Sequence, residues 1–174
     1  MDPLVPLVRA LTARDVHFVV IGVGGANYWA LGGSTIFTTK DRDLFLPLDA
    51  DNLVRAWGAC TAVGLELSSG GEPLDSPRDR WLAERVIERR ALVRGTDGRE
   101  LDIDLSLIMA GFDFETVWRE RRSFTVADVS VPVARLLHIV TSKHAAGRDK
   151  DRLFLATHRD ALEELLQHEN REPR

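Results

Sequence analysis

Apolar residues at the start of the chain recur at helical spacing, and a buried strand is expected to follow them. The helical spacing is that of Leu4, Val5, Leu7, Val8 and Leu11. We expect this helix to end near Asp15. Residues 17–23 form a continuous apolar run closed by glycine, which is typical of a buried strand. A short helix over 26–31, ended by Gly32 and Gly33, is expected next.

The middle of the chain shows further strand and helix signals. Residues 41–48 read as a second strand, and residues 49–51 as the cap of a helix over 52–63 that ends at Gly64. Residues 68–77 are rich in Ser, Gly and Pro, which favours a loop.

A hairpin is predicted where residues 86–93 and 101–108 flank the turn residues 95–98. Its second arm alternates. The positions expected on the apolar face are Leu101, Ile103, Leu105 and Leu107. The positions expected on the polar face are Asp102, Asp104 and Ser106. This alternation predicts a strand with one face in the core.

The last part of the chain is predicted to be mostly helical. A helix over 114–120 and a short strand over 123–131 come first. Two helices follow, over 133–146 and 150–167, joined at Gly147.

This order of elements predicts an α+β fold, with a small mixed or antiparallel sheet flanked by helices. We expect residues 1–131 to form the core and residues 132–168 to form a short C-terminal helical extension packed on it in one compact domain. The polar residues 169–174 are expected to be a frayed tail.

Composition restricts the class of protein. The chain has 174 residues, 44% hydrophobic and 29% charged, which is ordinary for a globular protein. Its net charge of −4 gives no global sign of nucleic-acid binding. A single cysteine, Cys60, excludes an intramolecular disulfide and a cysteine-rich zinc site. The longest apolar stretch, around residues 18–23, is too short to span a bilayer, so a cytoplasmic protein without membrane contact is expected.

A dense mixed-charge stretch covers residues 78–90. We interpret it as a solvated, salt-bridged face, although its arginines could also contact an RNA backbone. Three tryptophans are expected as core anchors: Trp57, Trp81 and Trp118. Trp29 follows the glycines closely and is the aromatic residue expected to line a pocket.

The candidate chemistry lies in glycines followed by aspartates. Gly24 and Gly25 follow a buried strand, where glycine lets a phosphate approach the backbone. Asp41 and Asp43 alternate on a predicted strand, so their side chains share a face about 7 Å apart. Such a pair can hold Mg²⁺ together with substrate phosphates. The alternative is that the glycines form a tight turn and the aspartates a wet strand face.

A third carboxylate, Asp102 or Asp104, would complete a two-metal site for in-line phosphoryl transfer if its strand lies beside Asp41 and Asp43. A metal-dependent nuclease uses similar carboxylates but does not need the glycines.

These residues resemble the DNA polymerase β-type nucleotidyltransferase superfamily. The segment 21–46, with its Gly24-Gly25 pair and Thr39-x-Asp41-x-Asp43, is similar to small bacterial nucleotidyltransferases of the abortive-infection, toxin–antitoxin and DUF6036-like groups. The string 143–151 is similar to the lysine, Gly-Arg and Lys-Asp arrangement of the same proteins. The resemblance extends over about residues 16–166.

The resemblance implies a role for each matching residue. Gly24 and Gly25 would contact the triphosphate, and Lys143 would lie near the phosphates. The implied metal ligands and catalytic residues are Asp41, Asp43 and Asp104. Asp104 is preferred to Asp102 for its spacing to Gly111-Phe112, and it would also help to deprotonate the acceptor hydroxyl. Lys150 and Asp151 are expected to fix the last helix.

The implied activity transfers a nucleoside monophosphate from a nucleoside triphosphate such as ATP to an acceptor, with Mg²⁺ or Mn²⁺ and release of pyrophosphate. The acceptor would be an RNA, a protein or a small-molecule hydroxyl, and a cognate toxin or antitoxin chain is an expected partner.

The alternative function is a degenerate transferase fold that acts as an antitoxin or regulatory partner. Two departures from the related sequences favour it: Phe37 stands where they carry arginine, and Arg42 lies between the two aspartates.

Overall fold

The computed structural model describes residues 2–31, 33 and 35–172. The helices are α1 (Leu4–Ala13), α2 (Gly22–Trp29), α3 (Ala50–Ala62), α4 (Arg80–Arg89), α5 (Phe114–Glu120), α6 (Leu136–Ala146), α7 (Asp149–Thr157) and α8 (Arg159–Arg171). The strands are β1 (Val19–Ile21), β2 (Asp41–Phe45), β3 (Glu66–Ser69), β4 (Glu72–Pro73), β5 (Val93–Thr96), β6 (Asp102–Ser106), β7 (Arg122–Val126) and β8 (Val129–Val133). None of the described helices is long and apolar enough to cross a membrane.

The strands form one mixed sheet in the order β4-β3-β5-β6-β2-β1-β8-β7. The pairs β2–β6 and β1–β8 are parallel, and the other neighbours are antiparallel. The parallel β2–β6 pair requires a long crossover, which the segment from α3 to β5 supplies. The predicted α+β fold with a mixed sheet flanked by helices is confirmed.

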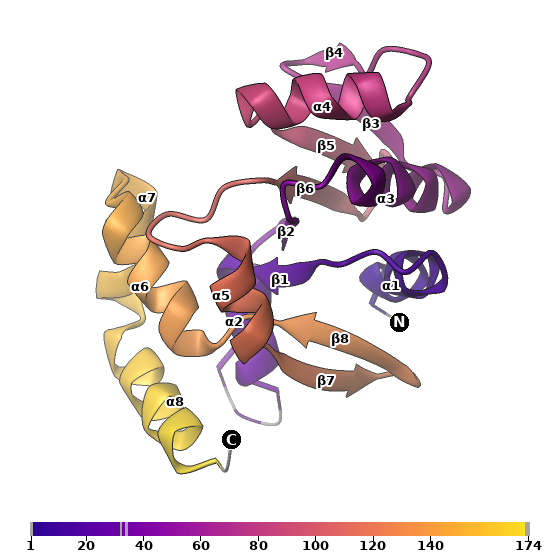
Figure 1. The fold of residues 1–174 in the computed structure, drawn as a ribbon. Coiled ribbons are helices and arrows are strands. Elements are labelled where there is room, and N and C mark those ends of the chain that lie inside the picture. The colour runs from indigo at the N-terminus through magenta and orange to yellow at the C-terminus, as the bar shows by residue number, and fades with distance from the viewer. Residues whose placement is uncertain (1, 32, 34, 173–174) are drawn as a thin grey trace.

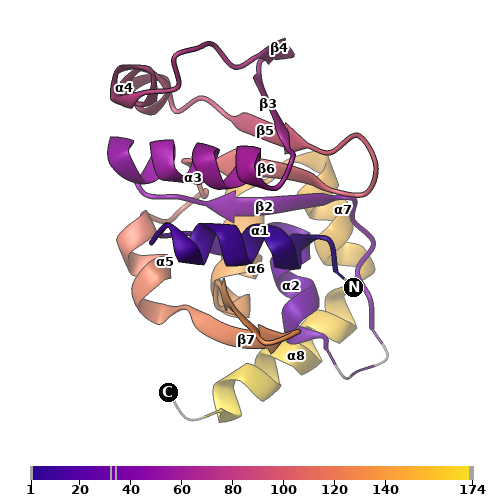
Figure 2. The same cartoon turned by 90° about the vertical axis from the view of Figure 1, so that its right-hand side faces the viewer.

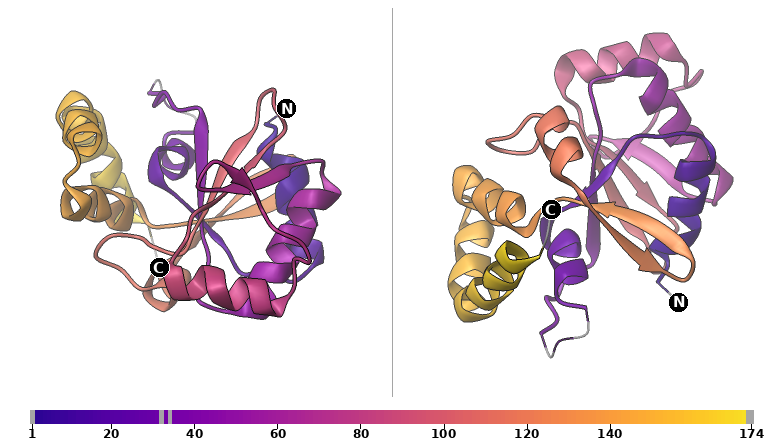
Figure 3. Two further views of the ribbon diagram at one scale, coloured as in Figure 1. Left: turned by 90° about the horizontal axis from the view of Figure 1, so that it is seen from above. Right: turned by 60° about the horizontal axis from the view of Figure 1, so that its bottom comes forward.

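Helices cover both faces of the sheet, and each face has its own apolar cluster. Helices α1, α3 and α4 lie on one face, whereas α2, α5 and α6–α8 lie on the other (Figures 1 and 2). Figure 3 shows the two helical layers from above, on opposite sides of the strands. Strand β1 alternates between the clusters, since Val20 packs on the first face and its neighbours Val19 and Ile21 pack on the second.

Strand β6 confirms the predicted alternation. Its apolar side chains are buried in the cluster beneath α1, α3 and α4, with Ile103 and Leu105 at 0% and 1% exposure. Its polar side chains therefore point to the opposite face, toward the side of α6 and α7. Burial of Ile103 and Leu105 thus fixes the direction in which Asp102 and Asp104 point.

The predicted strand over 86–93 is wrong, because its first half, residues 86–89, belongs to helix α4. Asp79 accepts a hydrogen bond from the Leu82 N–H and begins the helix, and Arg90 ends it in a left-handed conformation. Ala83 and Val86 then point into the core. The strand starts only at Val93.

Two hairpins replace segments expected to be a loop and a single strand. Residues 68–77 contain the end of β3 and all of β4. Residues 122–133 form the β7–β8 hairpin, which turns at Ala127 and Asp128 with positive φ at both. The central residues of such a turn are usually Asn or Gly, so Ala127 gave no sequence signal for the hairpin.

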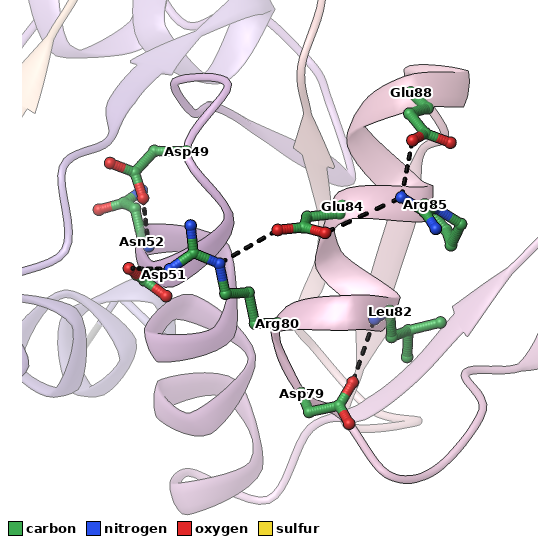
Figure 4. A network of polar contacts seen from close by, with 9 residues as sticks. All are labelled: Asp49, Asp51, Asn52, Asp79, Arg80, Leu82, Glu84, Arg85 and Glu88. Atoms are coloured by element: carbon green, nitrogen blue, oxygen red, sulfur yellow. Dashed lines mark hydrogen bonds and ion pairs between the residues drawn. The ribbon is translucent and has the colours of Figure 1, made fainter.

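The charged face of α4 is confirmed as solvated and salt-bridged. Arg80 bridges Glu84 of its own helix and Asp51 of α3, and Arg85 bridges Glu88 (Figure 4). Trp81 is not the expected core anchor: it is 63% exposed. Trp57, by contrast, is 1% exposed as predicted.

The C-terminal end is more ordered than the sequence predicted. The expected helix over 150–167 is divided at His158 into α7 and α8. The expected frayed tail is helical through Arg171, and Glu169 within it is buried. Residues 173–174 lie outside the described residues, as does Gly32, one of the two glycines expected to end α2.

Glu169 joins the end of the chain to the start of α6. Its carboxylate accepts hydrogen bonds from the Leu136 N–H at 2.6 Å and from Arg135 Nε at 3.0 Å. Arg135, in turn, bridges Glu120 of α5. A carboxylate at a helix N-terminus satisfies N–H groups that have no partner within the helix.

We predict that Glu169→Ala lowers the free energy of unfolding by about 2–4 kcal/mol, because it removes one of the two carboxylate partners of Arg135 and leaves a buried N–H without its partner. Glu169→Gln, which keeps an accepting oxygen, should cost less. Urea denaturation measures both, with exposed Glu163→Ala of the same helix as the control. Equal stability of the Glu169→Ala and control variants would contradict the prediction.

Candidate functional site

A cavity of about 570 Å³ opens where the polar face of the β2–β6 pair meets α6 and α7. One wall is acidic and is formed by Asp41, Asp43 and Asp104. The opposite wall is basic and is formed by Lys143, Arg148 and Lys150. Apolar side chains at the rim include Leu92 and Ile108, which are 45% and 57% exposed.

Strand pairing brings the carboxylates together. In the parallel β2–β6 ladder Asp43 lies opposite Asp104, and Asp41 lies opposite Asp102. Partners in a ladder point to the same face. Three of these four aspartates line the cavity and Asp102 does not, since its carboxylate accepts a 2.6 Å hydrogen bond from Thr96 Oγ1. Of the two candidates for the third carboxylate, the structure therefore places Asp104 in the cavity.

Asp43 is the most electrostatically perturbed carboxyl of the site. Burial, together with the nearby charges of Asp104 and Asp41, raises its pKa from 3.8 to about 6. Lys143 and Lys150 oppose this rise. A carboxylate crowded by like charges is stabilised by any cation that enters the cavity.

Arg94 of β5 engages the third carboxylate. Its Nε and Nη2 donate to the two oxygens of Asp104 at 2.8 and 3.2 Å, and its Nη2 lies 3.7 Å from Asp41. The hydrogen bonds to Asp104 and the negative charge of that carboxylate raise the pKa of Arg94 above its ordinary value. Over the described residues, no three acidic, histidine or cysteine side chains are grouped so as to hold a metal ion.

The basic wall is fixed by Asp151. This aspartate is fully buried, and it pairs with Arg148 at 2.6 Å and with Lys143 at 3.4 Å. Burial would raise its pKa, but the hydrogen bonds and charges of these two partners outweigh burial and lower it. Burial lowers the pKa of Lys143, against the opposing charges of Asp151 and Asp43. Asp151 thus joins α6 to α7, whereas Lys150, which we expected to fix the last helix together with Asp151, lines the cavity.

The glycines are arranged differently from the expected turn. Gly24 and Gly25 lie inside α2, and a side chain at Gly25 would press on Val20 of β1 and Ile139 of α6 at 3.0 Å. Gly22 lines the cavity instead. Its φ is +68°, and a methyl group there would overlap the Asp43 carboxylate. The glycine that lies against the Asp43 carboxylate is therefore Gly22, and phosphate binding at Gly24 and Gly25 stays a prediction.

Phe37 and Arg42, the two departures from the family pattern that the sequence resembles, lie outside the cavity lining. Phe37 is 1% exposed, and its backbone N–H and C=O both bond to the Asn27 amide at 2.8 Å. Arg42 alternates with the site aspartates, so it points to the other face of the sheet, where it pairs with Asp2 at 3.4 Å.

Two further single residues lie away from this cavity. Trp29, which we expected to line a pocket, donates from its Nε1 to the Ala134 carbonyl at 2.9 Å and borders a separate hollow against α8. Cys60 is buried, and burial raises the pKa of its thiol to about 12.

Sequence reasoning missed Gly22, Arg94 and Arg148 as lining residues. Gly22 carried a signal, because it is the first residue after the buried strand. Arg94 carried none without the register, since only the pairing Arg94↔Asp104 places it beside a carboxylate.

We predict a pH dependence of stability from Asp43. The pKa of Asp43 is higher in the folded state than in an unfolded chain, so between about pH 4 and 6 the folded state binds more protons than the unfolded chain. The free energy of unfolding therefore falls as the pH rises through that window. Asp43→Asn removes this loss. The variant should therefore be more stable than the wild type by about 1–3 kcal/mol at pH 7.5, a difference that shrinks at pH 4.

Urea denaturation at both pH values measures the effect. Asp128→Asn, at an exposed turn whose positive φ asparagine tolerates, is the matched control. The assignment is wrong if the Asp43→Asn and Asp128→Asn variants show the same pH profile.

No family model matches this chain, and neither does any curated protein. Its proposed function therefore rests on the resemblance described under Sequence analysis together with the geometry of the cavity.

Proposed function

We propose that this protein is a divalent-metal-dependent nucleotidyltransferase that moves a nucleoside monophosphate from a nucleoside triphosphate to an acceptor hydroxyl. The observation that supports it most is the register of the β2–β6 pair, which sets Asp43 beside Asp104 with Gly22 against Asp43. An acidic wall facing a basic wall suits a metal–triphosphate complex, which presents cationic and anionic parts at once.

The donor chemistry of the acidic wall suits Mg²⁺ or Mn²⁺. Carboxylate oxygens are the ligands of hard divalent cations, and the raised pKa of Asp43 reflects a charge that a cation would stabilise. Asp41 and Asp43 would hold the metal, with Asp104 as the third ligand once Arg94 releases it. The bound metal would polarise the phosphates and stabilise the charge of the leaving pyrophosphate.

The chain's own residues have complementary tasks in this reaction. The acceptor oxygen forms a bond to the α-phosphorus, the bond from that phosphorus to the bridging oxygen breaks, and pyrophosphate leaves. Lys143, Lys150 and Arg148 supply positive charge on the side where we place the leaving group. The acceptor proton passes to a carboxylate, for which Asp104 is the candidate.

The apolar rim suits a base or an acceptor group. Leu92 and Ile108 flank the carboxylates and expose apolar surface, which a planar base can cover. RNA, protein and small-molecule acceptors all present a hydroxyl, so the acceptor class is left to experiment.

The second candidate is a binding protein without transfer activity, for example an antitoxin or regulatory partner. The observation that favours it is the bidentate Arg94–Asp104 pair, which already satisfies the third carboxylate. Phe37 and Arg42 no longer favour it, because one is a core residue and the other faces away from the cavity.

We predict that Asp41→Asn and Asp43→Asn each lower nucleotide transfer by about a hundredfold or more, because each removes a metal-binding charge. The assay incubates the protein with α-labelled nucleoside triphosphates and Mg²⁺, and it offers total RNA, lysate protein and a metabolite extract separately. Label in one fraction and matching pyrophosphate release identify the acceptor class.

Asp128→Asn should retain transfer, and the thermal melts should show that all three variants are folded. Full activity in Asp43→Asn would contradict the assignment of Asp43 as a metal ligand. Calorimetry with a nucleoside triphosphate, with and without Mg²⁺, is combined with the pyrophosphate assay to separate the second candidate. Metal-dependent nucleotide binding together with pyrophosphate release supports the transferase, and the absence of both supports the binding protein.

A further inference from the structure

Arg94 occupies the centre of the acidic wall. It reaches across from β5 and contacts two of the three carboxylates, with both oxygens of Asp104 at 2.8 and 3.2 Å and Asp41 at 3.7 Å. Within the described chain, these aspartates are the only side chains with which its guanidinium makes hydrogen bonds or ion pairs. The bidentate geometry is the one in which arginine binds a carboxylate most strongly.

Arg94 and a divalent metal would need the same atoms. The metal would use oxygens of Asp104 and Asp41 as ligands, and these oxygens accept from or face the guanidinium. Two cations on one carboxylate repel each other. The guanidinium therefore opposes occupation by the metal as long as it stays on both oxygens of Asp104.

The surroundings permit the guanidinium to move away from Asp104. The Arg94 side chain is 46% exposed, whereas that of Asp104 is 14% exposed, so the arginine is the partner with room to turn toward solvent. The cations of the opposite wall are placed differently, because Lys143 and Arg148 are both paired with buried Asp151.

We propose that Arg94 is a resident cation that holds Asp104 in position and competes with the divalent metal for it, so that Arg94 sets the metal affinity of the site. This inference rests on the proposed function for the identity of the incoming cation. It makes Arg94 a positioning residue, which acts on the reaction through Asp104.

The test titrates Mn²⁺ alone into the purified protein by calorimetry. Arg94→Met keeps much of the side-chain length and removes the charge, and it should bind Mn²⁺ about tenfold more tightly than the wild type, equivalent to about 1.4 kcal/mol. Arg94→Lys keeps the positive charge but loses the bidentate guanidinium, so its Mn²⁺ affinity should lie between those of the wild type and Arg94→Met.

Arg99→Met is the matched control. Arg99 lies exposed between β5 and β6, so this variant loses the same charge at a distance from the carboxylates and should change the affinity by less than about twofold. The gain from Arg94→Met should also disappear when Asp104→Asn is added, because the competition acts on that carboxylate.

Three results would overturn the inference: Mn²⁺ affinity unchanged in Arg94→Met, an equal gain in Arg99→Met, or a full gain that persists with Asp104→Asn. Weaker binding of a metal-free nucleoside triphosphate, with unchanged Mn²⁺ affinity, would instead identify Arg94 as a phosphate ligand.

The outcomes separate this inference from the proposed function. If the wild type binds Mn²⁺ and transfers nucleotide, but Arg94→Met shows no gain in Mn²⁺ affinity, the inference alone is rejected. A gain in Arg94→Met without transfer by any of the proteins rejects the transferase and retains the competition. Mn²⁺ binding by neither protein rejects both.

Discussion

Repulsion among carboxylates is the constraint on which the site depends. The parallel β2–β6 ladder sets Asp43 beside Asp104, and Asp41 lies two residues away on the same face. Burial and this crowding both disfavour the charged form of Asp43 and raise its pKa to about 6. The arrangement persists because burial of the alternate apolar residues fixes the strands, and because Arg94 and Lys143 provide opposing charge. The fold therefore supports an unfavourable charge pattern that a bound cation would relieve.

The surrounding helices hold the basic wall against this acidic one. Helix α6 is tied at its start to Glu169 and near its end, through Lys143, to Asp151. Helix α2 packs closely against it because Gly25 has no side chain. Because buried carboxylates hold both ends of α6, Lys143 is fixed on the wall of the cavity opposite the strands.

Much of the fold and part of the site could be predicted from local patterns. The alternation over residues 101–107 gave the inner and outer faces of β6, and Asp49 marked the start of α3. The α4 helix was missed because Val86 and Ile87 favour a strand locally, while the capping Asp79 and the tertiary packing favour a helix. Glu169 and Arg94 could not be assigned, because their partners are distant in sequence or depend on strand register.

The route of the chain between β2 and β6 has a consequence for how such a site can diversify. Asp41, Asp43 and Asp104 belong to the adjacent core strands, whereas Arg94 belongs to the segment inserted between them, which forms the outer part of the sheet. Exchange or drift in that outer segment could alter the cation beside Asp104 and leave every carboxylate in place. Under the proposed role of Arg94, a change in the outer segment would therefore alter the metal affinity of the site without altering the three carboxylates that form it.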